Sequence, residues 1–167
     1  MKYLIIGLAS LFIHQINGQS MSPIQDRIHQ LFIATDQGDW SSVEASFAAE
    51  VVLDYSSMTQ VPAQVLKPNE ISTQWKSILP GFEHTHHQVG NFISKKEEES
   101  AAHAFCYGIA SHYLTHPEGN TWTVVGEYDF DLVKNEEGDW KVSKMTFHYK
   151  YQEGNVKLPA AAIENAK

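Results

Sequence analysis

Three long segments near the C-terminal end, at about 101–115, 121–134 and 140–152, constrain the fold of this chain more than any other feature. Alternation is clearest in 121–134, where acidic and apolar residues take opposite faces, as in a strand with one buried face, and 101–115 contains the apolar, strand-like run AFCYGIA. The intervening sequences, PEGN at 117–120 and NEEGD at 135–139, are short and rich in turn-forming residues. Such connections favour antiparallel pairing of neighbouring strands. With a shorter strand-like segment at 88–95, the sequence predicts a mostly antiparallel sheet.

The first part of the chain has helical periodicity instead. Helices are predicted over residues 23–36, 41–47 and 69–79, where apolar residues recur at intervals of three and four. A β-branched run at 51–57 predicts a strand, and the proline-containing stretch at 58–68 predicts a loop. Helices followed by sequentially paired strands predict an α+β domain, with three helices packed on one face of a curved sheet. The domain is expected to span residues 21–154, and the tail at 155–167 is expected to be flexible.

The composition limits the classes of partner. The chain has 167 residues and a net charge of −8, and its basic doublet at 95–96 is followed directly by three glutamates. Nucleic-acid binding needs clustered lysine and arginine, so this charge pattern argues against it. The single cysteine, Cys106, excludes an intrachain disulfide. Because Cys106 lies in an apolar run without a basic neighbour, a buried hydrophobic role is favoured over a nucleophile.

The first 20 residues differ in kind from the rest. Lys2 precedes an apolar run from Tyr3 to Ile13, and small or polar residues follow at 17–20. This pattern predicts a secretory signal peptide, cleaved after Gly18 or Ser20, and hence a secreted or periplasmic protein. The alternatives are a retained N-terminal anchor or a buried helix, although the apolar run is short for a membrane span. Once the peptide is removed, no membrane association is expected.

The stretch FEHTHHQVGN, residues 82–91, concentrates three histidines in four positions. The rings could be solvated on a turn, or His84 and His86 could share a strand face and chelate a metal ion. A zinc site needs three or four ligands, however, and no motif supplies the rest. Acid/base chemistry needs only one ring, which titrates near pH ~6.5, and a carboxylate such as Asp36 to orient it. Neighbours on a strand point to opposite faces, so at most one of His86 and His87 enters a pocket.

Four stretches in order, IATDQGDW, VVLDYSSM, HTHHQVGN and GEYDFDLVKNEEGDWKVSKM, resemble the SnoaL-like branch of the nuclear transport factor 2-like superfamily. The resemblance covers about residues 23–153. It implies a cone-shaped fold in which a strongly bent sheet wraps the helices around an apolar pocket. The last stretch bears mainly on the fold, and the first three bear on the chemistry.

Within that branch, the pattern is similar to that of scytalone dehydratase and related small dehydratases. The residues that match the dehydratase aspartate, tyrosine and two histidines are Asp36, Tyr55, His87 and His112. The resemblance implies that His87 is the general acid/base and that Tyr55 positions a water or polarises a carbonyl. It further implies that Asp36 holds His112 or the substrate. Thr35 stands where the dehydratase has a second tyrosine, so the resemblance implies proton-transfer chemistry rather than the same reaction.

Five further residues are expected to line the pocket, namely Trp75, Cys106, Gly108, Ala110 and Asp129. Cys106, Gly108 and Ala110 share a strand face with His112, and their small size would leave room for a ligand. Asp129 stands where the dehydratase has small polar residues. Alternation within 121–134, however, puts Asp129 on the face opposite Trp122 and the other apolar residues. The sequence leaves open which of these two faces lines the pocket.

These features together predict a cofactor-independent acid/base enzyme, of dehydratase or isomerase type, that acts on a small apolar oxygenated molecule. His87 would move the proton, supported by Asp36, Tyr55 and His112. The main alternative is a non-catalytic module that uses the same fold for small-molecule binding or protein association. A metal-dependent hydrolase is a third alternative. A homo-oligomer is expected by resemblance, and no cofactor is expected.

Overall fold

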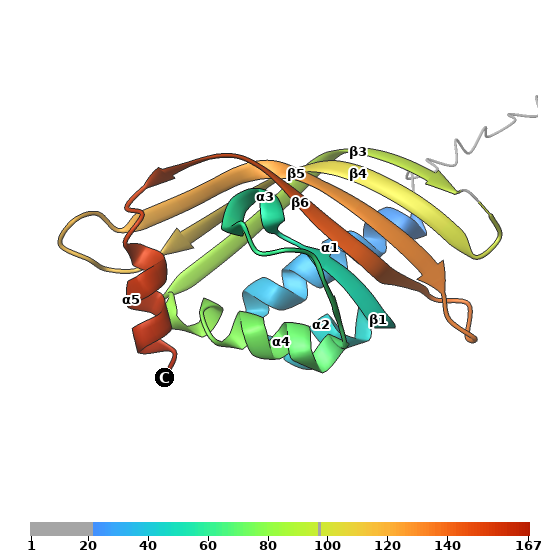
Figure 1. The fold of residues 1–167 in the computed structure, drawn as a ribbon, viewed down its shortest axis with the longest axis horizontal. Helices are drawn as coiled ribbons and strands as arrows, with labels where there is room; N and C mark the ends of the chain where they lie inside the picture. Colours follow the sequence, from blue (N-terminus) through green and yellow to red (C-terminus); the bar gives the residue numbers. More distant parts are fainter. Residues whose placement is uncertain (1–21, 97) are drawn as a thin grey trace, which may run out of the picture.

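A curved sheet covers one side of a set of helices, with the helices on its concave face (Figure 1). The computed structural model describes residues 22–96 and 98–167, so the predicted signal peptide lies outside the described residues. The strands are β1 (Phe47–Asp54), β2 (Gln64–Leu66), β3 (His84–Lys96), β4 (Ala101–Tyr113), β5 (Thr121–Lys134) and β6 (Trp140–Gly154). The helices are α1 (Pro23–Gln37), α2 (Trp40–Ala45), α3 (Ser56–Thr59), α4 (Pro68–Lys76), the 3-10 helix η1 (Leu79–Gly81) and α5 (Leu158–Asn165).

The sheet has the strand order β2-β1-β6-β5-β4-β3. The last four strands pair antiparallel with their neighbours in sequence, which confirms the pairing predicted from the alternating segments. β1 instead pairs parallel with β6, so the first strand joins the sheet beside the last one. The predicted α+β class, with helices on one face of a mostly antiparallel sheet, is confirmed.

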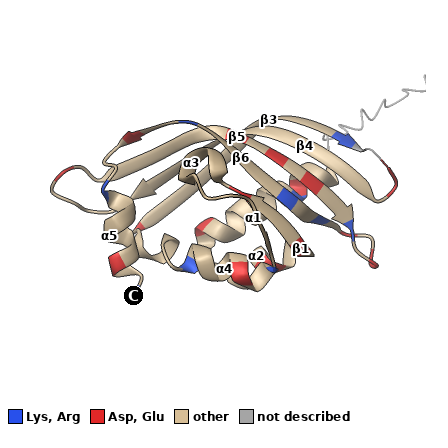
Figure 2. Cartoon of the chain, in the orientation of Figure 1, with Lys and Arg blue, Asp and Glu red and all other residues tan. Residues whose placement is uncertain are grey.

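The core lies between the concave face of the sheet and α1. Along β5, every second residue from Trp122 to Leu132 is buried, while the residues between them face outward. On α1, Ile28 and Leu31 are fully buried, and the Phe32 ring lies 5.2 Å from that of Tyr128. Acidic residues of β5 lie beside basic residues of β6 on the outer face (Figure 2). The burial of apolar side chains on one face and the exposure of charged ones on the other therefore determine which face of β5 is turned toward the core.

Several boundaries differ from the sequence prediction. Tyr55 lies just after β1, as the N-cap of α3, rather than on a strand. The predicted loop contains the short strand β2, which pairs with β1. Helix α2 begins earlier than predicted because the Asp39 carboxylate accepts a hydrogen bond from the N–H of Ser42 at 3.1 Å. No helix in the described part of the chain is long and apolar enough to cross a bilayer.

The C-terminal segment forms a packed helix, and the expectation of a flexible tail is wrong. Leu158 and Ala162, one helical turn apart on α5, are both fully buried. The side-chain amide of Asn165 donates to the carbonyl oxygen of Gly81 in η1 at 3.2 Å. Two apolar residues at this spacing suffice to hold α5 against η1 and the end of β5.

Candidate functional site

His87 on β3 and Asp36 on α1 form a hydrogen-bonded pair. The Nδ1 atom of His87 lies 2.6 Å from Oδ1 of Asp36, and the backbone N–H of His87 donates to Oδ2 at 2.7 Å. The hydroxyl of Thr85, on the same face of β3, donates to Oδ1 at 2.9 Å. Only 12% of the His87 side chain and 17% of the Asp36 side chain are exposed. The pairing of this histidine with this carboxylate, expected from the sequence, is present in the structure.

The position of Asp36 follows from the way α1 ends. Gly38 adopts a left-handed conformation, with φ of 66°, and the N–H groups of Gly38 and Asp39 donate to Thr35 and Ala34. This hydrogen-bonded end stops the helix just after Asp36, whose side chain faces β3. A carboxylate in the last helical turn is disfavoured by the helix dipole, so Asp36 depends on donors from β3.

The electrostatics of the pair set the tautomer of His87. Burial acts to raise the pKa of Asp36, but the hydrogen bonds and charge of His87 and the hydroxyl of Thr85 outweigh it and lower that pKa. Asp36 is therefore an anion and accepts the proton carried by Nδ1. A neutral His87 then has its lone pair on Nε2. That atom makes no hydrogen bond within the described part of the chain.

His112 on β4 lies beside His87 on the inner face of the sheet. The two rings meet edge to face, with their centroids 5.8 Å apart. Nδ1 of His112 lies 3.2 Å from the carbonyl oxygen of Trp122, which is its cross-strand neighbour. Asp36 binds His87 directly, and no hydrogen bond joins Asp36 to His112. The resemblance implied that Asp36 holds His112 or the substrate. The structure shows that Asp36 does not bind His112.

The surroundings of His112 keep its ring neutral. It is 5% exposed and packs against the rings of Phe82 and Trp122, at centroid distances of 4.7 and 4.6 Å. Burial, together with the charge of His87, lowers the pKa of His112 to about 4. Near neutral pH the ring therefore donates its Nδ1 proton to the Trp122 carbonyl.

Tyr55 contributes a phenol to the same region. Its ring is half-buried and lies 6.0 Å from that of Phe147. Burial raises the pKa of Tyr55, so the hydroxyl stays protonated over the physiological range. The hydroxyl makes no hydrogen bond with a described residue, which leaves it able to donate to a bound molecule.

These side chains converge on a cavity of about 320 Å³, called the inner chamber below. Its wall consists of Phe32, Thr35, Tyr55, Thr59, Gln74, Trp75, Ile78, Leu79, His87, His112 and Trp122. The predicted residues Tyr55, His87, His112 and Trp75 therefore line the same cavity, with His87 and His112 on the sheet and Trp75 on α4. Cavities that hold small ligands have volumes of roughly 300–1,000 Å³, so the inner chamber suits a small and largely apolar molecule.

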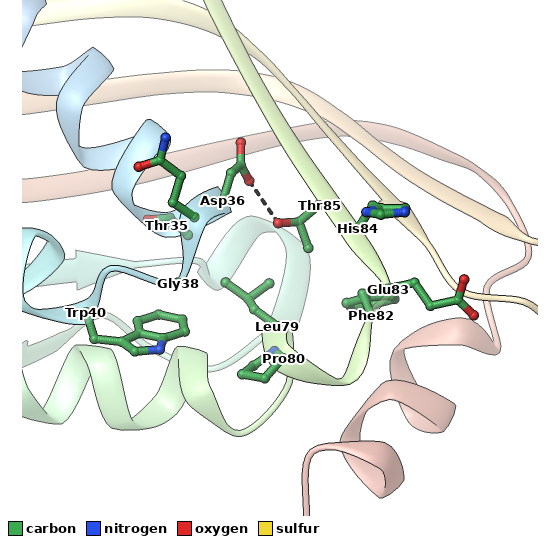
Figure 3. Close-up of a pocket in the computed structure, with 11 residues that line it drawn as sticks. Thr35, Asp36, Gly38, Trp40, Leu79, Pro80, Phe82, Glu83, His84 and Thr85 are labelled. Carbon is green, nitrogen blue, oxygen red and sulfur yellow. Dashed lines mark hydrogen bonds between the residues drawn. The ribbon is translucent and has the colours of Figure 1, made fainter.

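A second pocket, of about 290 Å³, lies on the other side of the pair and contains the Asp36 carboxylate in its wall. Figure 3 shows Asp36 and Thr85 facing each other, with His84 at the start of β3 and Glu83 just before it. Thr35 and Leu79 belong to both cavities and separate them. The imidazole end of the pair thus opens into an apolar chamber, and the carboxylate end opens into a polar one.

The small residues beside His112 do not widen the inner chamber. Cys106, Gly108 and Ala110 lie on β4, but none of them lines it. A Cβ at Gly108 would lie 2.3 Å from the ring of Tyr128, so this tyrosine fills the space that the small residues leave. Burial, with a smaller effect of the Asp129 charge, raises the pKa of the Cys106 thiol to about 12. The prediction that these three residues line the pocket is wrong.

Replacement of Gly108 by alanine is expected to lower the free energy of unfolding by about 2 kcal/mol, because the new methyl group would overlap the Tyr128 ring. Urea denaturation measures the effect. Gly90→Ala on β3 is the matched control, since nothing lies within 4 Å of a Cβ built there. Equal effects at the two positions would contradict this account of Tyr128.

Asp129 lies on the outer face of β5, and the prediction that it lines the pocket is also wrong. Its carboxylate oxygens lie 3.1 Å from Nε2 of His103 and 2.7 Å from Nε2 of His148. Asp131 binds the other nitrogen of His103 at 2.9 Å. The apolar residues from Trp122 to Leu132 occupy the inner face because their burial is more favourable than burial of carboxylates would be.

The homo-oligomer expected from the resemblance stays a prediction.

The two other histidines of the FEHTHHQVGN stretch are exposed. The stretch forms the start of β3, where His84 and His86 alternate with the inward residues Thr85 and His87. Of the neighbours His86 and His87, only His87 faces inward, in agreement with strand alternation and with the choice that the resemblance implied. In residues 22–96 and 98–167, no group of three or more His, Cys, Asp or Glu side chains is arranged to hold a metal ion.

Sequence reasoning missed three residues that shape the site. Thr85 donates to Asp36, and its place two residues before His87 on a strand could have revealed it. Phe32 stacks on the His87 ring at 5.4 Å, and it lies four residues before Asp36 on one face of α1. Trp122 accepts a hydrogen bond from His112 and lines the inner chamber, which only the pairing of β4 with β5 reveals.

The SnoaL-like domain family matches residues 19–146. Among solved structures, the Kfla4162 protein from Kribbella flavida has a TM-score of 0.74 at 19% identity, over 86% of this chain and 94% of that one. A Novosphingobium aromaticivorans protein provisionally assigned as a scytalone dehydratase has 0.69 at 17% identity, over 80% and 85%. The type-3 hexachlorocyclohexane dehydrochlorinase of Novosphingobium barchaimii has 0.66 at 13% identity, over 80% and 88%. A comparison with proteins of curated function found no match.

The structural likenesses, at these identities, show the fold. The family match is independent of them and covers most of the chain. Proteins named for dehydratase and dehydrochlorinase activity are among those that share the fold. The chain belongs to the SnoaL-like domain family and has the nuclear transport factor 2-like fold.

Proposed function

We propose that the protein is a cofactor-independent acid/base enzyme, of dehydratase or isomerase type, acting on a small apolar oxygenated molecule in the inner chamber. One observation carries the proposal. The Nε2 atom of His87 opens into an apolar chamber while Nδ1 is held by an anionic Asp36 at 2.6 Å. A base of this kind is oriented by its carboxylate, which also stabilises the imidazolium once the base has taken a proton.

The chemistry follows from the groups that line the chamber. Nε2 of His87 takes a proton from a carbon next to a carbonyl group, and the hydroxyl of Tyr55 donates a hydrogen bond to the oxygen that gains charge. In a dehydration, the imidazolium then gives the proton to the departing hydroxyl group. A C–H and a C–O bond break, a C=C bond forms and water leaves. In an isomerisation, the proton returns to a different carbon.

The neighbours of His87 support this role. Phe32 stacks on its ring, and His112, whose pKa is lowered to about 4, adds no positive charge beside it near neutral pH. An apolar and largely dry environment strengthens the hydrogen bonds that stabilise developing charge. The shared fold with proteins named for dehydratase and dehydrochlorinase activity is consistent with a lyase step.

The non-catalytic alternative uses the same chamber. Apolar side chains such as Trp75, Ile78 and Leu79 make up much of its wall and would bind a small molecule without any proton transfer. The two readings differ in one respect, because only an enzyme needs a basic Nε2 in contact with its ligand.

Asp36→Asn is expected to lower the rate of proton abstraction by about tenfold or more, because an amide favours the wrong tautomer and cannot stabilise the imidazolium. The probe is 5-nitrobenzisoxazole, an apolar molecule that loses one C–H proton to a base. Its N–O bond then breaks and a coloured nitrophenolate forms, so the rate reports on a positioned base without knowledge of the natural substrate.

The matched control for this test is Asp39→Asn. Asp39 is exposed, lies three residues later and caps α2, a position where asparagine serves equally well. Its rate should equal that of the unmodified protein. Binding of the probe with no acceleration over imidazole in buffer would contradict the enzyme and support the binding module.

A further inference from the structure

A smaller cavity lies next to the inner chamber, on the other side of Tyr55. It has a volume of about 190 Å³ and is called the side chamber below. Its wall consists of Leu53, Tyr55, Thr59, Val61, Pro62, Gln64 and Gln74. Tyr55, Thr59 and Gln74 also line the inner chamber, so the two cavities share a boundary made by these three side chains.

The walls of the side chamber are held in place by pairing of distant segments. The segment between α3 and α4 runs alongside β1, where Leu53 pairs with Gln64 of β2 (Figure 1). The side-chain amide of Gln74 on α4 lies 3.4 Å from Oε1 of Gln64. The side chamber is thus lined by residues of β1, β2 and α4 and of the segment that joins α3 to β2.

The chemistry of the side chamber is mainly apolar. Leu53, Val61 and Pro62 supply hydrocarbon surface, and 52% of Val61 is exposed to solvent. An apolar group lying here would cover that surface, which is favourable in water. Of its polar lining residues, Tyr55, Thr59 and Gln74 belong to the boundary with the inner chamber, and Gln64 lines the side chamber alone.

We propose that the substrate is an elongated molecule with two apolar parts. One part, of the size of a small ring system, occupies the inner chamber, and an apolar extension passes between Thr59 and Gln74 into the side chamber. An oxygen function between the two parts lies within reach of the Tyr55 hydroxyl. This inference concerns the same site as the proposed function and rests on it to that extent. It makes Val61 a determinant of the substrate length that the protein accepts.

The test compares two phenols that differ in length, 4-ethylphenol and 4-heptylphenol, by calorimetric measurement of Kd. The unmodified protein should bind 4-heptylphenol at least about tenfold more tightly, because the longer chain buries additional methylene groups. Val61→Asp should remove most of that gain by placing a charge beside the chain, and it should leave the affinity for 4-ethylphenol unchanged.

Val65→Asp is the matched control, because Val65 lies on β2, is 66% exposed and does not line the side chamber. It should leave both affinities unchanged. Equal weakening by the two variants, or no gain from the longer chain, would overturn the inference. Binding is measured without turnover, so this outcome does not depend on whether His87 acts as a base. If the protein bound the two phenols with the expected difference but did not accelerate the opening of 5-nitrobenzisoxazole, the role of the side chamber would be supported and the proposed enzymatic activity would be contradicted.

Discussion

Replacement of His87 by alanine is expected to lower the rate of 5-nitrobenzisoxazole opening by about a hundredfold or more, with the fold unchanged. The reason is that His87 lines the inner chamber, is oriented by Asp36 through Nδ1, and has an Nε2 atom that makes no hydrogen bond to a described residue. General-base catalysis by a positioned side chain contributes about 10²–10⁴-fold. The rate constant is measured from the coloured product, and thermal unfolding checks the fold.

The adjacent residue provides the control for this prediction. His86 has the same side chain and the same strand but points to the outer face, where it is exposed. His86→Ala should therefore leave the rate unchanged. If both variants kept the full rate, the base would have to be another group and the proposed role of His87 would be lost. His87→Gln, which keeps a polar side chain of similar size, separates loss of the base from loss of packing against Phe32.

The second large effect concerns stability and pH. The free energy of unfolding is expected to fall by about 3 kcal/mol as the pH falls from about 6.5 to 4, because of His112. In the unfolded chain His112 takes up a proton near its ordinary pKa of 6.5, whereas in the folded protein its pKa is about 4. Between these values the unfolded state binds more protons, so acid favours unfolding. Asp36 acts in the same direction at lower pH, since its folded pKa lies below its ordinary value.

Urea denaturation across this pH range measures the effect, and His112→Gln identifies its source. Glutamine keeps a donor for the Trp122 carbonyl but does not titrate. The variant should show a smaller loss of stability between pH 6.5 and 4 than the unmodified protein, whatever its stability at neutral pH. A purely structural role of His112 would shift both curves by a constant amount and would contradict the prediction.

The parts of the fold that were predicted correctly depend on short-range patterns. The pairing of β3 to β6 follows from alternation and short turns, which act within about fifteen residues of each other. The parallel pairing of β1 with β6 has no such local signal, because it joins segments separated by almost the whole domain. Helix α5 was missed because Leu158 and Ala162 give too weak a pattern until η1 provides a surface for them.

The residues of the site show the same difference between features that follow from local patterns and features that depend on distant segments. Strand parity allows only one of His86 and His87 to face inward, and the resemblance identifies His87 as that residue, with Asp36, Tyr55 and His112 as its companions. Whether a small residue opens a cavity depends on what neighbouring strands place above it, which is why Gly108 was misread. The Tyr128 ring that fills its space comes from β5.

The α+β class and the order of the last four strands could be predicted from the sequence because they follow from periodicities along the chain, and the inward orientation of His87 was predicted from strand alternation together with the family resemblance. The tertiary structure was needed to show that Asp36 binds His87 and not His112, that Asp129 faces outward and that a further cavity lies beside Tyr55. These outcomes depend on distances between elements far apart in sequence, where packing and burial decide between alternatives that local patterns leave equal.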